Sequence, residues 1–309
     1  MTDSCFCCQK PLEAGHRYHP RCLSRLFGGR LLPSIPFGRA EMPALVARAQ
    51  GRMSISGVQM KLSARLDKGT GRLESAAAGG THILKPEPER FPFIPRNENL
   101  CMNMAEEAGF PVPPHGLFAM ADKSLCYVVK RFDRTDDGTK IQKETMFQIL
   151  GATEKYAGSL EMVGKAIRSH VANVGLDTID FFERVLFCFL TGNGDMHLKN
   201  WALLYHGKDL SLAPCYDLVC SRVYIPNEDD SALTVNGKKN KLTRADFSAL
   251  ADSLGIDPKA SANSFDKLRL AQEKLREMAS SSELPFGLRQ KLSHIIKTRY
   301  ERLYGKDAA

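Results

Sequence analysis

The sequence lacks the features of a membrane or secreted protein. Its most apolar stretch, VLFCFLTG at 185–192, is far shorter than the about 20 residues that a transmembrane helix needs. The opening residues, MTDSCFCCQK, contain no apolar signal-peptide core. An internal repeat and a long low-complexity tract are also missing. We therefore expect a cytoplasmic protein that makes no membrane contact.

The nine cysteines do not form a disulfide framework. Several are scattered through apolar stretches, which is typical of a protein in a reducing compartment. These are Cys101, Cys126, Cys188, Cys215 and Cys220. With 309 residues, 43% apolar and 25% charged, the chain is long enough for one large domain or for two lobes.

The formal net charge of +8 admits three kinds of partner: a nucleic acid, an acidic protein or a phosphate-rich ligand. Only NGKKNK at 236–241 gathers basic residues, and elsewhere they are dispersed. A basic surface that is merely solvated explains such dispersion equally well. Charge alone therefore does not choose a function.

Residues 51–130 have the texture of strands, interrupted by one helix. The stretches VQMKLSARL, THILKP, HGLFAM and LCYVVKRF alternate apolar and polar residues, and the turn at 67–80 is rich in glycine. Apolar residues at helical spacing predict a helix over 97–108, capped by Asn97 and ended by Gly109 and Pro111. The expected order is strand, strand, helix, strand, strand.

The chain is mostly helical after residue 140. Amphipathic segments are expected at 143–151 and 160–175, a buried helix at 178–192, a hairpin at 201–215 and three helical segments after 242. The fold class we predict is α+β, with a small β-rich lobe followed by a mostly helical lobe. The expected division is a Cys/His-rich segment at 1–50, the small lobe at 51–132 and the helical lobe at 133–309.

The segment TGNGDMHLKNWALLYHGKDLSLAPCYDL, 191–218, carries the strongest chemical signal. Four residues separate Asp195 from Asn200, and Asp217 follows the hairpin. Phosphoryl transfer uses one carboxylate for the attacking hydroxyl, and an amide oxygen and a second carboxylate to hold Mg²⁺. The D-x-x-x-x-N spacing matches a protein-kinase catalytic loop. Asp and Asn also favour turns for purely structural reasons.

Two upstream features fit the same chemistry. HILKP places Lys85 on a strand, where it is suited to contact phosphates, and Ser54–Gly57 opens the preceding strand as a loop that could cover them. A strand lysine is more often an ordinary surface residue, and SISG is looser than a glycine-rich kinase loop. The order of all these elements along the chain is what favours a kinase.

Together, SISGVQMK, HILKP, RNEN, VVKRFDR, GNGDMHLKNW and LAPCYDLV resemble the HipA family of bacterial toxin serine/threonine kinases. The resemblance covers about residues 50 to 225 and implies a two-lobed protein-kinase-like fold that uses ATP and Mg²⁺. It implies Asp195 as the catalytic base and Asn200 and Asp217 as Mg²⁺ ligands. The residues it places at ATP are Lys85 and His197 near the phosphates, Lys130, Arg131 and Phe132 near the adenine, and the loop Ser54, Ile55, Ser56 and Gly57.

The same resemblance implies that the kinase phosphorylates its own loop, at Ser54 or Ser56. A phosphate adds about −1.5 to −2 charges at neutral pH, which would repel the phosphates of ATP. The alternative is that both serines simply fit a tight loop.

The short Cys/His-rich start resembles the HipT branch, in which a separate small protein, HipS, replaces an N-terminal subdomain. Such a HipBST-type toxin–antitoxin system implies HipS-like and HipB-like partners. Contact with DNA would then be made through the antitoxin complex and not directly. The implied substrate is an aminoacyl-tRNA synthetase, with the tryptophanyl enzyme favoured, so that phosphorylation inhibits translation.

The first residues also suggest a metal. Cys5-x-x-Cys8 and His19-x-x-Cys22 have the spacing of a structural zinc knuckle, with Cys7 and His16 as spare ligands. A metal-free turn docked on the small lobe is the alternative.

The expected helix offers three acidic partners for Lys85. Glu98 is the choice suggested by RNEN, and Glu106 and Glu107 are alternatives. Two other functions stay open: an idle pseudokinase that binds partners or nucleic acid, and a kinase for a small molecule or lipid.

Overall fold

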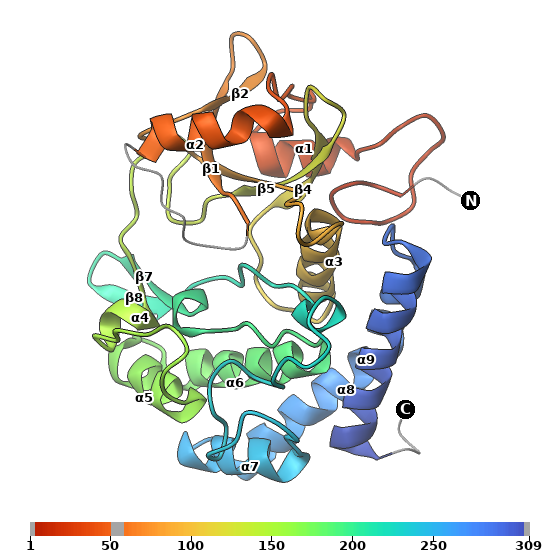
Figure 1. Ribbon diagram of the computed structural model, residues 1–309. Coiled ribbons are helices and arrows are strands. Elements are labelled where there is room, and N and C mark those ends of the chain that lie inside the picture. Colours follow the sequence, from red (N-terminus) through yellow and green to blue (C-terminus); the bar gives the residue numbers. More distant parts are fainter. Residues whose placement is uncertain (1–3, 51–58, 306–309) are drawn as a thin grey trace. The chain divides into compact units, whose positions relative to one another are not determined.

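The computed structural model describes residues 4–50 and 59–305 (Figure 1). The predicted loop Ser54–Gly57 lies outside the described residues. The chain divides into two compact units. We call Met1–Asn103 with Pro113–Ile141 the sheet unit, and Met104–Val112 with Gln142–Ala309 the helical unit. The boundaries expected at residues 50 and 132 stay a prediction.

A five-stranded antiparallel sheet forms the centre of the sheet unit. Its strands run in the order β2-β1-β3-β5-β4. In Figure 1, α1 and α2 lie over this sheet. The elements are α1 (Pro20–Phe27), α2 (Met42–Gln50), β1 (Leu62–Asp67), β2 (Arg72–Ser75), β3 (His82–Pro86), α3 (Ile94–Glu107), β4 (His115–Ala119) and β5 (Leu125–Lys130).

The alternation of side chains along β3 gives the sheet two different faces. His82 and Leu84 point to the face covered by α1, where His82 Nε2 lies 2.9 Å from the carbonyl oxygen of Leu26. Lys85 points to the opposite face and contacts Glu98 of α3. The strand register therefore decides that the lysine meets α3.

The helical unit packs its helices around α6 (Val174–Leu190). From Phe181 to Leu190 every residue of α6 is buried. A three-stranded sheet in the order β6-β7-β8 adjoins the helices. The elements are β6 (Lys143–Thr145), α4 (Met146–Ile149), α5 (Leu160–His170), β7 (Ala202–His206), β8 (Asp209–Leu212), α7 (Arg244–Ser253), α8 (Pro258–Ser281) and α9 (Phe286–Tyr304). The expected hairpin, buried helix and three C-terminal helices are confirmed.

The predicted start of the helix at Asn97 is wrong. α3 begins at Ile94, and the backbone N–H of Asn97 donates to the carbonyl of Phe93 at 3.0 Å. Pro95 suits this earlier start because a proline fits the first turn, where its missing N–H has no helical partner. Asn97 is consequently a buried residue within the helix and not its cap.

Two other segments differ from the expectation. The glycine-rich turn contains β2, which pairs Leu73 with Leu66 of β1, and a single buried leucine gives no strand periodicity. The helix expected at 143–151 is reduced to the one turn of α4, because 143–145 pairs with β7 as β6. Thr145 then begins α4 in a capping box with Gln148.

Among the described helices, none combines the length and the apolar character required to cross a membrane.

Gly116 of β4 marks a close approach between the sheet and the Cys-rich loop. A Cβ at this position would lie 2.5 Å from Cys7 Sγ and 3.1 Å from Cys7 Cα. We expect Gly116→Ala to lower the free energy of unfolding by about 1–3 kcal/mol, because the loop must move to admit the methyl group. Thermal or urea unfolding measures this. Gly29→Ala is the control, since nothing lies within 4 Å of its Cβ position. Equal stability of the two variants would contradict the close approach.

Candidate active site

The loop between α6 and β7 holds Asp195 and Asn200 in a closed conformation. His197 N–H donates to the carbonyl of Asp195 at 2.8 Å, and Asn200 N–H donates to the carbonyl of His197 at 2.9 Å. The Asn200 side-chain amide donates to the Asp195 carbonyl at 3.2 Å. Because Nδ2 is used in this way, Oδ1 of Asn200 is the atom left to act as an acceptor or a metal ligand.

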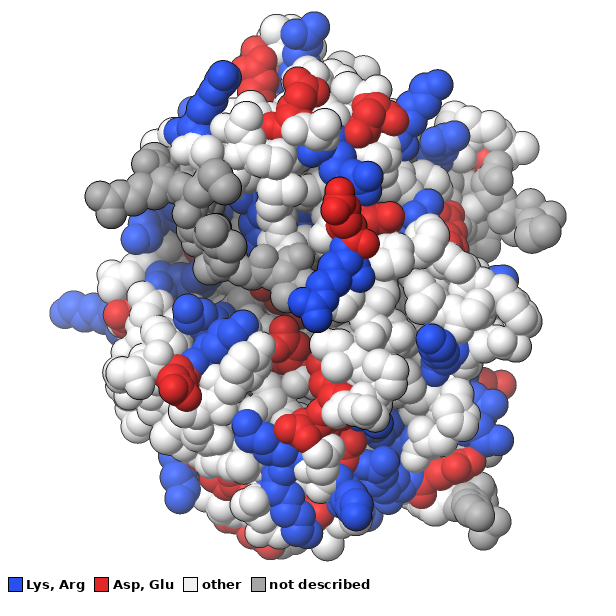
Figure 2. Space-filling model, viewed as in Figure 1, with Lys and Arg blue, Asp and Glu red and all other residues white. Residues whose placement is uncertain are grey.

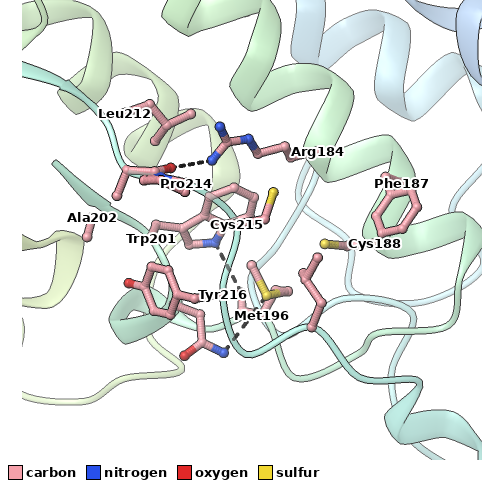
Figure 3. Close-up of a pocket in the computed structure, with 13 residues that line it drawn as sticks. Arg184, Phe187, Cys188, Met196, Trp201, Ala202, Leu212, Pro214, Cys215 and Tyr216 are labelled. Atoms are coloured by element: carbon pink, nitrogen blue, oxygen red, sulfur yellow. Dashed lines mark hydrogen bonds between the residues drawn. The ribbon is translucent and has the colours of Figure 1, made fainter. Parts of the chain in front are cut away.

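An apolar pocket of the helical unit lies beside this loop. It is lined by Met196, Asn200 and Trp201 on one side and by the segment from Leu212 to Tyr216 on the other. The indole N–H of Trp201 donates to the Met196 carbonyl at 3.4 Å, and Trp201 is 2% exposed. Figure 3 shows Arg184 extending from α6 toward Pro214, where it donates to the carbonyl of Ala213. Trp201 is therefore a core residue of the helical unit.

Asp217 is linked to the loop through its neighbour. The Tyr216 hydroxyl donates to the carbonyl of Lys199 at 2.9 Å, so the residues next to Asp217 and Asn200 are joined directly. Asp217 has a φ of 56°, in the left-handed region that few residues other than glycine adopt. Backbone strain of this kind is concentrated at functional sites.

His197 lies near the carboxylates of both Asp195 and Asp217. Burial lowers the pKa of His197, while the charges of Asp195 and Asp217 act in the opposite direction. The ring is buried, and its Nδ1 has no hydrogen-bond partner in the part of the chain that the structure describes. A buried polar atom without a hydrogen-bond partner destabilises a protein core, but it is common at a site where a ligand supplies the missing partner.

The side chains of Asn200 and Asp217 are suited to bind a divalent cation. Carboxylate and amide oxygens are the ligands that Mg²⁺ prefers. Asn200 and Asp217 supply such oxygens, and Asn193 Nδ2 is a second buried atom for which the described residues offer no partner. The residues present are therefore compatible with Mg²⁺ and phosphate at this loop.

Tyr156 contacts the predicted catalytic base and was not foreseen from the sequence. Its hydroxyl donates to Asp195 Oδ1 at 2.8 Å, and its ring meets the His197 ring edge-on at 5.3 Å. Burial raises the pKa of Tyr156, and the carboxylate of Asp195 adds to this effect. The Lys239 ammonium donates to the Tyr156 carbonyl at 3.2 Å. Tyr156 and Asp195 are 39 residues apart in the sequence, so no short-range motif links them.

Glu228 supports the backbone of the 195–200 loop at Gly194, the residue before Asp195. The N–H of Gly194 donates to Ser221 Oγ at 2.9 Å, and the Ser221 hydroxyl donates to Glu228 Oε2 at 2.7 Å. A Cβ on Gly194 would lie 2.5 Å from the Glu228 carboxyl carbon. Only glycine fits at this point, and nothing in the local spacing marks Gly194 for this role.

In the sheet unit, Lys85 forms an ion pair with Glu98. The two side chains are 4% and 2% exposed. The Lys85 ammonium also lies 5.5 Å from the centre of the Tyr127 ring. The expected pairing with Glu98, and not with Glu106 or Glu107, is present.

The three residues predicted near the adenine lie at the end of β5: Lys130 is its last residue, and Arg131 and Phe132 follow. Lys130 pairs with Asp136 at 2.7 Å, and Arg131 pairs with Asp133 at 2.7 Å. Phe132 is partly buried. Arg131 also lines a polar pocket of the sheet unit together with Lys61 and Arg134. Their role toward a nucleotide stays a prediction.

The Cys/His-rich start brings four predicted ligands together. The ligand atoms of Cys5, Cys8, His19 and Cys22 all lie within 4.8 Å of one another. The two spare candidates, Cys7 and His16, are not part of this group. The nine cysteines all lie among the described residues, and the structure joins none of them in a disulfide.

Charge is mixed on the molecular surface. On the face shown in Figure 2, lysines and arginines are interspersed with acidic side chains. Within the basic cluster 236–241, Lys238 pairs with Asp246 at 2.8 Å and Lys239 binds the Tyr156 carbonyl. This cluster therefore stabilises the helical unit, which weakens the case for a nucleic-acid surface there.

Comparison with known proteins places these features in a family. The HipA-like C-terminal domain matches residues 53–279. The chain is 27% identical over 302 residues to a Haemophilus influenzae protein named "Putative kinase", covering 88% of this chain and 87% of the relative. It is 31% identical to a Sinorhizobium fredii protein named "Putative kinase Y4dM", covering 80% of this chain and 64% of the relative. It is 25% identical to the serine/threonine-protein kinase toxin HipA of Shewanella oneidensis, covering 66% and 52%.

Solved structures share the fold. The HipA chain from a complex of Shewanella oneidensis HipA, HipB and operator DNA matches with a TM-score of 0.69 at 20% identity, covering 83% of this chain and 67% of that one. The proinflammatory kinase CtkA of Helicobacter pylori matches with a TM-score of 0.53 at 16% identity, covering 74% and 89%. The predicted α+β kinase-like fold, with a sheet-rich part and a helical part, is confirmed.

The Glu228 carboxyl generates a testable pH dependence. Burial raises the pKa of Glu228 from 4.5 to about 7, helped by the charge of Asp195 and opposed by Ser221 and Arg222. Between these values the folded protein holds a proton that the unfolded chain has released. The free energy of unfolding should therefore fall as the pH rises through this window.

Glu228→Gln should flatten this part of the curve of thermal midpoint against pH. Glu154→Gln, at an exposed position, is the control and should leave the curve unchanged. A Glu228→Gln curve identical to that of the unaltered protein would contradict the assignment.

Proposed function

The chain belongs to the family of HipA-like C-terminal domains, and from that premise we propose that it is an ATP- and Mg²⁺-dependent protein serine/threonine kinase. The observation that carries the proposal is the closed loop from Asp195 to Asn200, joined to the Asp217 segment by the hydrogen bond from Tyr216 to Lys199. This arrangement supports a site of one carboxylate, one amide oxygen and a second carboxylate, which is the set that phosphoryl transfer requires.

The proposal gives each predicted residue a role in the reaction. Asp195 would accept the proton of the attacking hydroxyl and orient its oxygen. Asn200 and Asp217 would hold Mg²⁺, which when bound neutralises charge on the phosphates. Lys85, kept in place by Glu98, would bind the phosphates of ATP. Lys130, Arg131 and Phe132 would contact the adenine, and His197 would lie near the phosphates.

The loop of Ser54, Ile55, Ser56 and Gly57 would cover the phosphates, with Ser54 or Ser56 as the site of autophosphorylation. A new phosphate in that loop would repel ATP, because both carry negative charge. The kinase would thus silence itself after it has acted.

The wider role we propose is that of a toxin in a toxin–antitoxin system of the HipBST type. Support comes from the relative named as a toxin kinase and from the structural match to a HipA chain solved with HipB and operator DNA. Partners would be a HipB-like DNA-binding protein and a HipS-like small protein. The substrate would be an aminoacyl-tRNA synthetase, of tryptophanyl type by resemblance, so that translation stops.

Asp195→Asn tests the proposed activity. The variant should lose about 10²–10⁴-fold in phosphoryl transfer, because the amide cannot take the proton of the hydroxyl. The measurement is intact mass before and after Mg²⁺-ATP, with purified synthetases as added acceptors. Asp209→Asn, at an exposed residue of β8, is the matched control and should keep full activity. Equal transfer by both variants would sink the assignment of Asp195.

Tyr156→Phe tests the contact at the proposed base. A substrate hydroxyl must compete with the Tyr156 hydroxyl for Asp195, and one such hydrogen bond contributes about 1 kcal/mol. We expect kcat/KM for protein phosphorylation to rise about fivefold in the variant. Tyr205→Phe, which loses a hydroxyl bonded to Glu144, is the control. A fall in kcat/KM for Tyr156→Phe would mean that this hydroxyl assists the reaction.

A further inference from the structure

The four potential ligands near the N-terminus have the dimensions of a tetrahedral metal site. Zinc binds sulfur at about 2.3 Å, which places tetrahedral ligands about 3.8 Å apart. All four ligand atoms here lie within 4.8 Å of one another, and Cys8 Sγ lies 3.3 Å from His19 Nδ1. Small adjustments of the side chains would bring them to the distances that a bound ion requires.

The groups around these ligands are arranged as they are at metal sites. His19 Nε2 lies 3.1 Å from the carbonyl oxygen of Pro11, so that a proton on Nε2 leaves the lone pair of Nδ1 directed at the cysteines. The N–H of His19 donates to Cys5 Sγ at 3.4 Å, a contact that fixes the position of this sulfur next to His19. Each of these two contacts therefore orients a potential metal ligand, His19 in the first case and Cys5 in the second.

The loop that carries the ligands is attached to α3 by two asparagines. The Asn103 side-chain amide donates to the Cys7 carbonyl at 2.7 Å, and the Asn99 amide donates to the Phe6 carbonyl at 3.2 Å. Asn99 Oδ1 in turn lies 3.0 Å from His115 Nδ1 of β4. Phe6 and Cys7 fall between the first two ligands, Cys5 and Cys8. The position of these carbonyls therefore depends on how the ligand loop is folded.

The loop is also attached to the sheet. Leu117 N–H donates to the Phe6 carbonyl at 2.9 Å, and the Tyr18 hydroxyl donates to the Leu117 carbonyl at 2.9 Å. One carbonyl, that of Phe6, thus receives bonds from both β4 and α3. The loop connects the strand to the helix at the helix turn that bears Glu98.

We propose that Cys5, Cys8, His19 and Cys22 bind one structural zinc ion, and that the metal-bound loop acts through Asn99 and Asn103 to hold α3 in register with the sheet. Glu98 precedes Asn99 directly, so the zinc site is a positioning element for the ion pair with Lys85. This inference concerns the sheet unit alone and stands whether or not the chain is a kinase.

Metal analysis with paired histidine variants tests the site. Protein purified without added metal should contain about one zinc per chain by mass spectrometry of the elements. His19→Ala should lower this content at least tenfold, and His16→Ala should leave it unchanged, because His16 is exposed and outside the ligand group. Cys8→Ser should lose zinc where Cys7→Ser retains it. Zinc-free protein, or equal loss in the His16→Ala variant, would overturn the proposal.

Asn103→Ala tests the attachment to α3 separately from metal binding. The variant keeps all four ligands and should retain its zinc, while amide hydrogens of 94–103 should exchange with solvent at least tenfold faster. Removing zinc from the unaltered protein with a chelator should speed exchange in the same residues. Asn263→Ala, an exposed asparagine of α8, is the control.

The pattern of exchange decides the second half of the proposal. Faster exchange confined to the ligand loop and α3 would support it. Uniform acceleration over β1 to β5 would show that Asn103→Ala only weakens the fold, and unchanged exchange in α3 would show that the loop does not hold the helix. Either of the last two results would contradict the positioning role.

Discussion

The buried ion pair of Lys85 and Glu98 is the constraint on which the sheet unit depends. Removing two charges from water costs several kcal/mol for each ion unless they meet with good geometry. That geometry requires the register of β3, which turns Lys85 away from α1, and a fixed rotation of α3, which turns Glu98 toward it. The bonds from Asn99 and Asn103 to the N-terminal loop, and from Asn99 to His115, fix the rotation. Much of the sheet unit is thus arranged around one salt bridge.

The helical unit achieves rigidity in another way, by closing a short loop on itself. Backbone bonds hold Asp195, His197 and Asn200, while Trp201 fills the space below them. Glu228 and Ser221 hold the Gly194 amide. Two residues after Glu228, the buried Asp230 pairs with Arg299 at 2.7 Å, so that α9 supports the same region. The loop is therefore held by its own backbone, by the adjacent Trp201 and by two more distant parts of the chain, the segment from Ser221 to Asp230 and α9.

Sequence reasoning reached the fold class and the order of the polar residues, because both depend on local spacing. The D-x-x-x-x-N pattern, the alternation in HILKP and the Cys/His spacing are all short-range signals. It failed where long-range contacts decide. Tyr156, Glu228 and Asn103 act on residues far along the chain, and nothing in their own neighbourhood marks them. The start of α3 was misjudged because Asn97 has the chemistry of a cap, whereas Pro95 had already fixed an earlier first turn.

The N-terminal loop also sets an order of events during synthesis. Asn103 and Cys7 are 96 residues apart, and the β4 contacts are more distant still. At about 5–20 residues per second, the loop leaves the ribosome about 5–20 seconds before its partners on α3 exist. Before then, contacts with earlier parts of the chain can order it, such as those from Cys5 to Lys10 and from Phe6 to Arg17. The helix α3 is therefore synthesised after the loop to which Asn103 binds, and it joins contacts that the earlier residues can already make.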